Sequence, residues 1–137
     1  MGDNVTPADY YYTTVPDKPG EGARILAVLR DAGVNLYAFS GFPEGRRSQL
    51  DFVPTDGAAF LAAAKAAKIK LSRAKKVFLI SGDDRVGAIA GVCGRLAAAK
   101  INVTAVDAAC AGAGRYGAIL WVKPRDVKKA AAVLGAM

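Results

Sequence analysis

The sequence predicts an α+β protein made of two copies of one βαββαβ unit, and two observations lead to this fold class. The first is a repeat: residues 15–39 and 82–106 align without a gap at an offset of 67 residues and share seven identities. The second is that both halves pass through β-rich and helix-like stretches in the same order. A duplicated unit of this length indicates two small domains in one chain. The identical pairs are Asp17/Asp84, Gly20/Gly87, Ala23/Ala90, Leu29/Leu96, Ala32/Ala99, Asn35/Asn102 and Ala38/Ala105.

The first half of the chain predicts the elements of one unit in order. A strand at 10–15 is rich in tyrosine and threonine and ends at Pro16, which has no N–H to continue a ladder. Apolar residues then recur at helical spacing over 20–32, and Gly33 is well placed to end this helix. The remaining expected elements are a hairpin of strands at 34–42 and 49–53, a helix at about 55–67 and a short strand at 69–71.

The second half repeats this order but ends without a candidate for the last strand. Either one sheet edge is left open for a partner strand, or another segment, such as the N-terminus, fills the place. We place the two domains at residues 8–72 and 74–137, each a ferredoxin-like unit with an antiparallel sheet and both helices on one face. The expected elements are strands at 77–80, 101–110 and 118–122 and helices at 86–99 and 126–134.

Composition removes several classes of chemistry. The chain has 137 residues, 53% of them hydrophobic, which is enough for a real core, and a formal net charge of +7. It contains no histidine and two cysteines without metal-like spacing, so no imidazole base, Ser-His or Cys-His pair is available. We therefore expect no catalytic residue, no metal site and no cofactor, and we do not expect an enzyme. The cysteines suit a reduced, cytoplasmic protein. No stretch of the sequence reaches the 18 or so apolar residues of a membrane span, so we expect no membrane partner.

The repeated loop before each first helix is the main candidate site. Gly20 removes a side chain where the backbone turns into the helix, and the unpaired N–H groups of a helix start suit a carboxylate. Asp17 offers a carboxylate that can accept from an ammonium group. Such a loop fits a zwitterion such as a free amino acid. The alternative is structural: Asp17 can cap its helix, and Asn35 can hold the backbone between helix and strand.

Two βαββαβ units with these loops resemble a tandem of ACT domains, a family of small-molecule-binding regulatory units. The similarity extends from about Tyr10 to Leu134; Asp17-Lys18-Pro19-Gly20 matches the family's loop fully, whereas the second copy has Val86 in place of the proline. The resemblance implies pockets where the first loop of one unit meets the second strand of a neighbouring unit. The implied ligand-binding residues are Asp17, Pro19, Gly20, Asn35 and Leu36 in the first unit and Asp84, Gly87, Asn102 and Val103 in the second.

These observations predict a stand-alone, allosteric regulatory protein that binds an amino acid. The resemblance also implies a homodimer and a regulated metabolic enzyme as partner. One alternative is an RNA-binding module, because the strand order and basic charge suit it; the third strand, however, holds Phe52 as its one aromatic residue, so we expect no nucleic-acid partner. The other alternative is a small ferredoxin-like enzyme, which would have to use groups such as Asp17, Arg24, Arg46 or Arg47.

Overall fold

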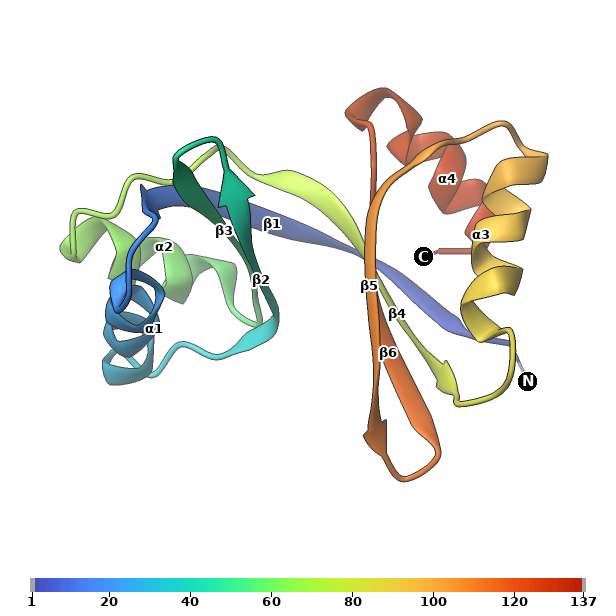
Figure 1. Cartoon of the computed structure of the whole chain (residues 1–137), viewed down its shortest axis with the longest axis horizontal. Helices are drawn as coiled ribbons and strands as arrows, with labels where there is room; N and C mark the ends of the chain where they lie inside the picture. The colour runs from blue at the N-terminus through green and yellow to red at the C-terminus, as the bar shows by residue number, and fades with distance from the viewer. Residues whose placement is uncertain (1, 137) are drawn as a thin grey trace. The chain divides into compact units, whose positions relative to one another are not determined.

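The computed structural model describes residues 2–136, and the chain forms two compact units. The first unit is Asp9–Lys75, and the second consists of the chain from Lys76 onward together with the N-terminal segment up to Ala8. In each unit two helices cover one face of an antiparallel sheet (Figure 1). The α+β class with ferredoxin-like units, predicted from the sequence, is confirmed. Residues 4–7, which lie outside both predicted domain ranges, belong to the second unit.

The sheet of the first unit is built on the C-terminal half of strand β1 (Asn4–Pro16). This half pairs antiparallel with β3 (Arg47–Pro54), from Tyr11 opposite Phe52 to Pro16 opposite Arg47. β3 pairs in turn with β2 (Leu36–Glu44), which gives the order β2-β3-β1. The end of β1 and the β2–β3 hairpin therefore lie at the same end of the unit.

Helices α1 (Glu21–Asp31) and α2 (Gly57–Ala66) cover one face of this sheet. Alternation along β3 places Leu50 and Phe52 toward the helices, and the Phe52 ring lies 5.4 Å from the ring of Phe60 on α2. Asp51 lies between them in sequence and therefore faces the other side of the sheet. The core of the first unit consists of Tyr11, Val15, Ile25, Leu29, Leu50, Phe52 and Phe60.

The short strand expected at 69–71 is not formed, and the next strand begins only at Lys75. Ser72 N–H donates to the Tyr12 carbonyl at 2.8 Å, as in a strand ladder. The return bond is different, because Tyr12 N–H donates to the Ser72 hydroxyl oxygen at 3.0 Å rather than to a carbonyl. A side chain thus interrupts the ladder, while Ile69 and Leu71 still pack against the core.

The second unit uses the N-terminal half of β1 as the strand that the sequence does not provide after the last helix. Within this unit the strand order is β1-β4-β6-β5, so residues 4–8 lie beside β4. Of the two possibilities left open above, the N-terminal segment fills the place. The other elements are β4 (Lys75–Asp83), α3 (Ala88–Ala98), β5 (Val103–Gly112), β6 (Arg115–Val122), the 3-10 turn η1 (Pro124–Asp126) and α4 (Val127–Leu134).

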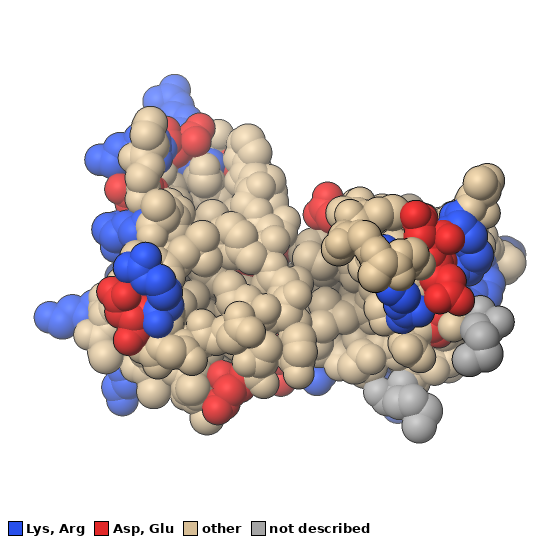
Figure 2. All heavy atoms as spheres, turned by 90° about the horizontal axis from the view of Figure 1, so that it is seen from below, with Lys and Arg blue, Asp and Glu red and all other residues tan. Residues whose placement is uncertain are grey.

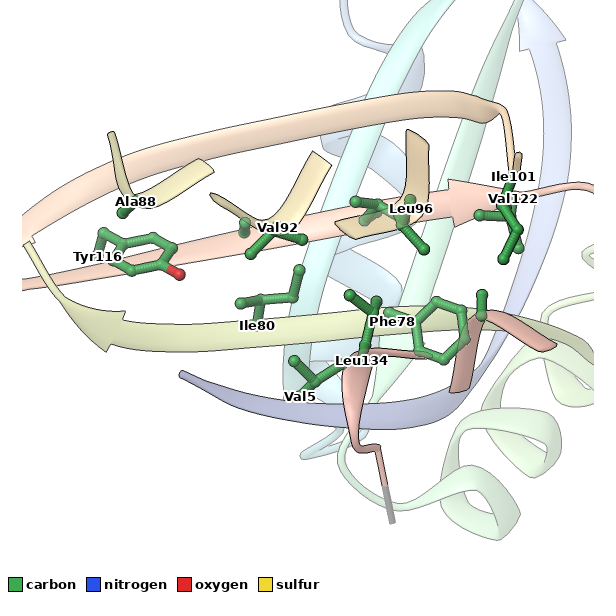
Figure 3. Close-up of a cluster of buried hydrophobic side chains, with 13 residues drawn as sticks. Val5, Phe78, Ile80, Ala88, Val92, Leu96, Ile101, Tyr116, Val122 and Leu134 are labelled. Atoms are coloured by element: carbon green, nitrogen blue, oxygen red, sulfur yellow. The ribbon is translucent and has the colours of Figure 1, made fainter. Parts of the chain in front are cut away.

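The N-terminal strand is part of the second hydrophobic core. Val5 is 7% exposed and lies with Ile80 of β4 and Leu134 of α4 in one cluster (Figure 3). Leu96 of α3 and Leu120 of β6 are fully buried in the same cluster. Burial of a valine side chain contributes roughly 1.5–3 kcal/mol. The segment 4–8 is therefore held by packing as well as by strand pairing.

The four α-helices within residues 2–136 end in the same way, with a residue in the left-handed region just after the last turn. In α2 this residue is Lys68, with φ 59°, and the next N–H, that of Ile69, donates to the Ala64 carbonyl at 2.9 Å. This 6→1 bond defines the Schellman motif, which satisfies carbonyls left over at a helix end. The left-handed residues are Gly33, Lys68, Lys100 and Gly135.

Candidate functional site

The first candidate loop, Asp17–Gly20, connects β1 to α1. Gly20 is the N-cap of α1 with φ 92°, a conformation that L side chains rarely adopt, so the turn itself requires glycine. No side chain caps this helix. Asp17 instead accepts a hydrogen bond from the Ser48 hydroxyl at 3.0 Å. The capping role considered for Asp17 is therefore wrong, and its carboxylate is tied to β3 rather than to the helix.

An open hollow of about 270 Å³ lies beside this loop. The loop and the start of α1 contribute Asp17, Lys18 and Glu21 to its wall, and the β2–β3 hairpin contributes Phe42 and Ser48. Glu21 also pairs with Arg24 at 3.0 Å. The first N–H groups of α1 have no acceptor within the helix and carry the positive end of its dipole. The carboxylates of Asp17 and Glu21 therefore line the hollow beside a helix start that favours anions.

The second candidate loop follows β4 and has the same backbone form. Gly87 is the N-cap of α3 with φ 81°, and again no side chain caps the helix. Asp84 N–H donates to the Gly114 carbonyl at 2.8 Å, which ties this loop to the β5–β6 hairpin. Val86, which stands where the first loop has Pro19, is fully exposed. The two loops therefore share a turn but differ in their side-chain contacts.

Arg85 of the second loop is bound by a carboxylate from the N-terminus. Its guanidinium donates to the two carboxylate oxygens of Asp3 at 3.0 and 3.2 Å and to the Asp83 carbonyl at 3.0 Å. The Asp3 side chain is only 5% exposed. Hydrogen bonding from Arg85 holds the pKa of Asp3 below its usual value, against the opposing effect of burial. The pair is a bidentate ion pair with one well-buried member.

The second loop borders a larger hollow of about 390 Å³. Asp84 and Arg85 line it together with Cys110 of β5 and Tyr116 of β6. The neighbouring Asp84 carboxylate raises the pKa of the Cys110 thiol. The Tyr116 hydroxyl is buried without a hydrogen bond to any described residue, although burial, and then the nearby Asp3 carboxylate, raise its pKa. The Tyr116 hydroxyl and the Asp3 carboxylate are close neighbours with no hydrogen bond between them.

The structure does not bring Asn35 and Leu36 to the loop of their own unit. α1 runs back from the loop for 11 residues, about 16 Å, before the chain reaches Asn35. Asn35 accepts from the backbone N–H of Leu36 at 2.9 Å and, through its carbonyl, from Thr55 N–H at 3.0 Å. Asn35 thus fixes the backbone between α1 and β2, which is the structural role given as the alternative to ligand binding. Any ligand contact by Asn35 or Leu36 requires the loop of another unit and stays a prediction.

The same separation holds in the second unit. Asn102 and Val103 lie at the start of β5, where Val103 pairs with Val122 and packs against the core. The loop residues Asp84 and Gly87 lie at the opposite end, because Asp83 and Gly112 both pair with Arg115. Within one unit, each loop is therefore completed by the hairpin beside it and not by the start of the second strand.

The hairpin residues that complete each hollow could not be predicted from the sequence. Ser48 follows Asp17 by 31 residues and Tyr116 follows Asp84 by 32, and neither forms a motif with its loop. A signal was nevertheless present in the βαββ order, since the second and third strands of such a unit must turn at the end where the first strand leaves the sheet. Arg85 lies in the second predicted loop, between Asp84 and Val86, but nothing in the sequence connects it to Asp3.

A buried carboxylate lies away from both loops. Asp51 of β3 is 4% exposed and accepts a hydrogen bond from Gln49 Nε2 at 2.9 Å. Burial raises the pKa of Asp51, while Gln49 and the more distant Lys75 partly oppose the shift. The Lys75 ammonium lies 5.5 Å from the centre of the Tyr12 ring instead. Because burial disfavours the ionised form of Asp51, this carboxylate lowers the free energy of unfolding at neutral pH.

Residues 2–136 contain no group of three or more Cys, Asp or Glu side chains arranged to hold a metal ion. Over the same range, no helix is both long and apolar enough to span a membrane.

Comparison with solved structures places the fold beside known regulatory subunits. A protein of Bacteroides thetaiotaomicron, BT0572, matches with a TM-score of 0.82 and 20% identity over 96% of this chain and 89% of that one. The ligand-free regulatory subunit of aspartate kinase from Thermus thermophilus matches with a TM-score of 0.65 and 18% identity over 98% of this chain and 95% of the subunit. The structure of the aspartokinase alpha and beta subunits gives 0.63 and 21% over 98% and 95%.

These likenesses, all below 25% identity, establish the fold: it is ACT-like, as the loops and element order predicted. No protein-family model matches the chain. No curated protein matches it either.

Proposed function

We propose that the chain is a regulatory protein that binds a free amino acid in the hollow beside the first loop. The observation that carries this proposal is the position of Asp17, whose carboxylate lines the hollow next to the uncapped start of α1. An α-ammonium group would donate to Asp17, and an α-carboxylate would accept from the first N–H groups of the helix. Lys18, exposed in the same wall, adds positive charge on the carboxylate side.

The size of the hollow supports a small metabolite. Ligand pockets for drug-sized molecules occupy roughly 300–1,000 Å³. The first hollow, at about 270 Å³, is slightly smaller than this range, and the second, at about 390 Å³, lies near its lower end. An aliphatic amino acid side chain would contact Phe42 and Pro43 of the hairpin. The likeness of the fold to aspartate kinase regulatory subunits supports a regulatory role for such binding.

The experiment is a thermal-shift screen of the purified protein against all twenty amino acids, followed by calorimetric titration of any that stabilise it. A ligand at a hundredfold excess over its dissociation constant adds about 2.7 kcal/mol to the stability of the folded state. We expect Asp17→Asn to abolish the shift. The matched control is Asp31→Asn, which removes the same charge at the far end of α1, where Asp31 pairs with Arg30. No shift with any amino acid would contradict the proposal.

The regulatory step of this proposal uses a homodimer formed through strand β2. β2 is the edge of its sheet, and residues 36–43 carry no charged side chain. Tyr37 is 67% exposed and Phe39 is 38% exposed on this strand. Protein edges usually carry charges that prevent pairing, so an uncharged aromatic edge favours a partner strand. The same edge of a second copy fits it, because a two-fold axis sets equal strands antiparallel.

Analytical ultracentrifugation tests the dimer. We expect Tyr37→Lys to dissociate it, since the lysine places a charge on the pairing edge, whereas Val86→Lys on the exposed loop leaves it intact. A wild-type protein that sediments as a monomer at every concentration would rule the dimer out. The proposed setting is the cytoplasm, where both free cysteines, Cys93 and Cys110, stay reduced.

The RNA-binding alternative finds little support in the positions of the aromatic rings. Base stacking requires exposed aromatics on the central strands, but Tyr10 and Tyr11 of β1 and Phe52 of β3 are buried. Tyr12 of β1 is half-buried, and the Lys75 ammonium lies 5.5 Å from the centre of its ring. On the face shown in Figure 2, several groups of Lys and Arg also contain Asp or Glu, which interrupts a positive surface.

The enzyme alternative depended on Asp17 and three arginines. Arg24 is paired with Glu21. Arg47 donates to the Thr14 carbonyl at 3.2 Å. Neither arginine therefore extends freely toward a reacting group beside Asp17, and the arrangement favours binding over catalysis.

A further inference from the structure

Arg85 of the second loop forms an anion-binding site, called the seat below, and the side chain of Asp3 already occupies it. The seat consists of the Arg85 guanidinium, with the Tyr116 hydroxyl beside it. Both residues line the 390 Å³ hollow. The occupant is the Asp3 carboxylate, which takes the two-pronged bond from Arg85 at 3.0 and 3.2 Å.

The occupant is fitted closely. A Cβ built on Gly82 would collide with the Asp3 carboxylate and approach Tyr116 Cε1 at 3.0 Å, so this position of β4 has room for Asp3 only because it is glycine. The Asp3 side chain is 5% exposed, whereas the Arg85 side chain remains 44% exposed. Arg85 is thus open to solvent on the side away from Asp3. A ligand can reach the guanidinium without first unfolding the unit.

We infer that Asp3 is an internal competitor for this seat, and that a carboxylate-bearing ligand entering the hollow at Arg85 displaces it. Asp3 itself shows which chemistry the seat accepts, because it is a carboxylate bound through both oxygens. The inference rests on the proposed function in one respect, that the β–α loops of this fold bind small molecules, but it concerns the second loop and does not involve Asp17.

Displacement has a consequence for strand β1. Asp3 directly precedes Asn4, the first residue of β1, and the segment up to Ala8 completes the sheet of the second unit. Release of Asp3 therefore removes one of the contacts that hold the beginning of that strand, which strand pairing and the packing of Val5 also hold. The other end of β1 leads through Pro16 into the first loop, so one strand supports both candidate sites. A ligand that alters how firmly Asn4–Ala8 is bound in the sheet changes the affinity of any second ligand whose site depends on β1. The second ligand changes the affinity of the first by the same factor.

The affinity of the seat should rise when the competitor is removed. A site that is free in only a fraction of molecules shows an apparent affinity lowered by that fraction. If Asp3 leaves Arg85 free in about one molecule in ten, Asp3→Asn lowers the apparent dissociation constant for a carboxylate about tenfold. The matched control is Asp83→Asn, which removes the same charge from the last residue of β4, where the carboxylate pairs with Arg115. We expect it to bind as the wild type does.

The test is an NMR titration of the ¹⁵N-labelled full chain with acetate at constant ionic strength, read from the Arg85 side-chain N–H and the Val5 backbone N–H. We expect acetate to shift both signals in the wild type, to expose the backbone N–H groups of Val5, Thr6 and Ala8 to faster hydrogen exchange, and to bind Asp3→Asn about tenfold more tightly. Arg85→Gln should abolish the response.

Two results would overturn the inference: equal acetate affinity in Asp3→Asn and Asp83→Asn, or an Arg85 shift without any change at Val5. Inorganic phosphate is titrated in parallel, and tighter binding of phosphate than of acetate by Asp3→Asn would refute the carboxylate class. Because the readout is acetate at Arg85, its failure leaves the Asp17 proposal standing, and failure of the amino acid screen leaves this inference standing.

Discussion

At two of the helix ends described above, a lysine adopts the left-handed backbone conformation that a glycine adopts at the other two. Lys68 and Lys100 have φ angles of 59° and 60°, and each accompanies the 6→1 hydrogen bond of a Schellman motif. Gly33 and Gly135 occupy the same position after α1 and α4, with φ 73° and 68°. The chain thus contains its own comparison between a strained and an unstrained helix end. We predict that Lys68→Gly and Lys100→Gly stabilise the protein.

The magnitude follows from two opposing effects. A left-handed conformation costs an L residue with a Cβ about 1–2 kcal/mol, and glycine avoids this cost. Glycine loses more backbone entropy on folding, about 0.5–1 kcal/mol relative to alanine. Each substitution should therefore raise the free energy of unfolding by about 0.5–1 kcal/mol. The two positions lie in different units, so their effects should add. For a chain of this length, 1 kcal/mol corresponds to roughly 3 °C in Tm.

Urea unfolding at neutral pH, monitored by circular dichroism, measures the change. The control is Lys65→Gly, which removes the same side chain three residues earlier, inside the last turn of α2. There glycine should destabilise by about 1 kcal/mol, because the position is helical. Opposite signs for Lys68→Gly and Lys65→Gly are the expected result. If both substitutions destabilise to the same extent, the conformational argument is refuted.

Two further predictions concern buried groups. Burial raises the pKa of Asp51, so the folded state binds the Asp51 proton more tightly than the unfolded state does. The stability that protonated Asp51 contributes is therefore lost as the pH rises through the pKa of the folded state. Asp51→Asn should therefore raise the free energy of unfolding at pH 7, with a gain that vanishes below the unperturbed pKa of 3.8; an equal gain at pH 3 and pH 7 in urea melts would contradict this. Gly82→Ala should destabilise by about 1–3 kcal/mol, because its Cβ meets Asp3 and Tyr116. Gly117→Ala is its control, since the new Cβ finds its nearest neighbour at 3.9 Å, and equal calorimetric Tm values for the two variants would refute the clash.

The elements of the fold could be read from the sequence wherever local periodicity and packing agree. The apolar spacing of Ile25 and Leu29 predicted α1, and both residues are buried in the first core. The segment Asn4–Ala8 could not be identified as a strand, because it contains a proline and alternates poorly. Tertiary packing decides its state: Val5 enters the second core, and the segment takes the edge beside β4. Local propensity is a weak guide for strands formed by distant partners.

The candidate site shows the same limit. The repeated Asp and Gly positions located both loops, because a tight turn into a helix requires particular residues close together in the chain. The partners of these loops could not be found in that way. Ser48 reaches Asp17 only because the β2–β3 hairpin folds back to the end of β1, and Asp3 reaches Arg85 across 82 residues of sequence.

The sequence by itself determined the α+β class, the two-unit plan and the backbone form of both loops, since each depends on interactions within a few residues or on a repeat that is visible as such. Only the tertiary structure decided which strand completes the second unit and which side chains border each hollow. It also decided that Asp17 contacts Ser48 of the β2–β3 hairpin rather than the start of α1, and that Asp3 pairs with Arg85. These contacts join residues that are distant in the chain, and their pairing depends on strand register and core packing, which no local pattern records.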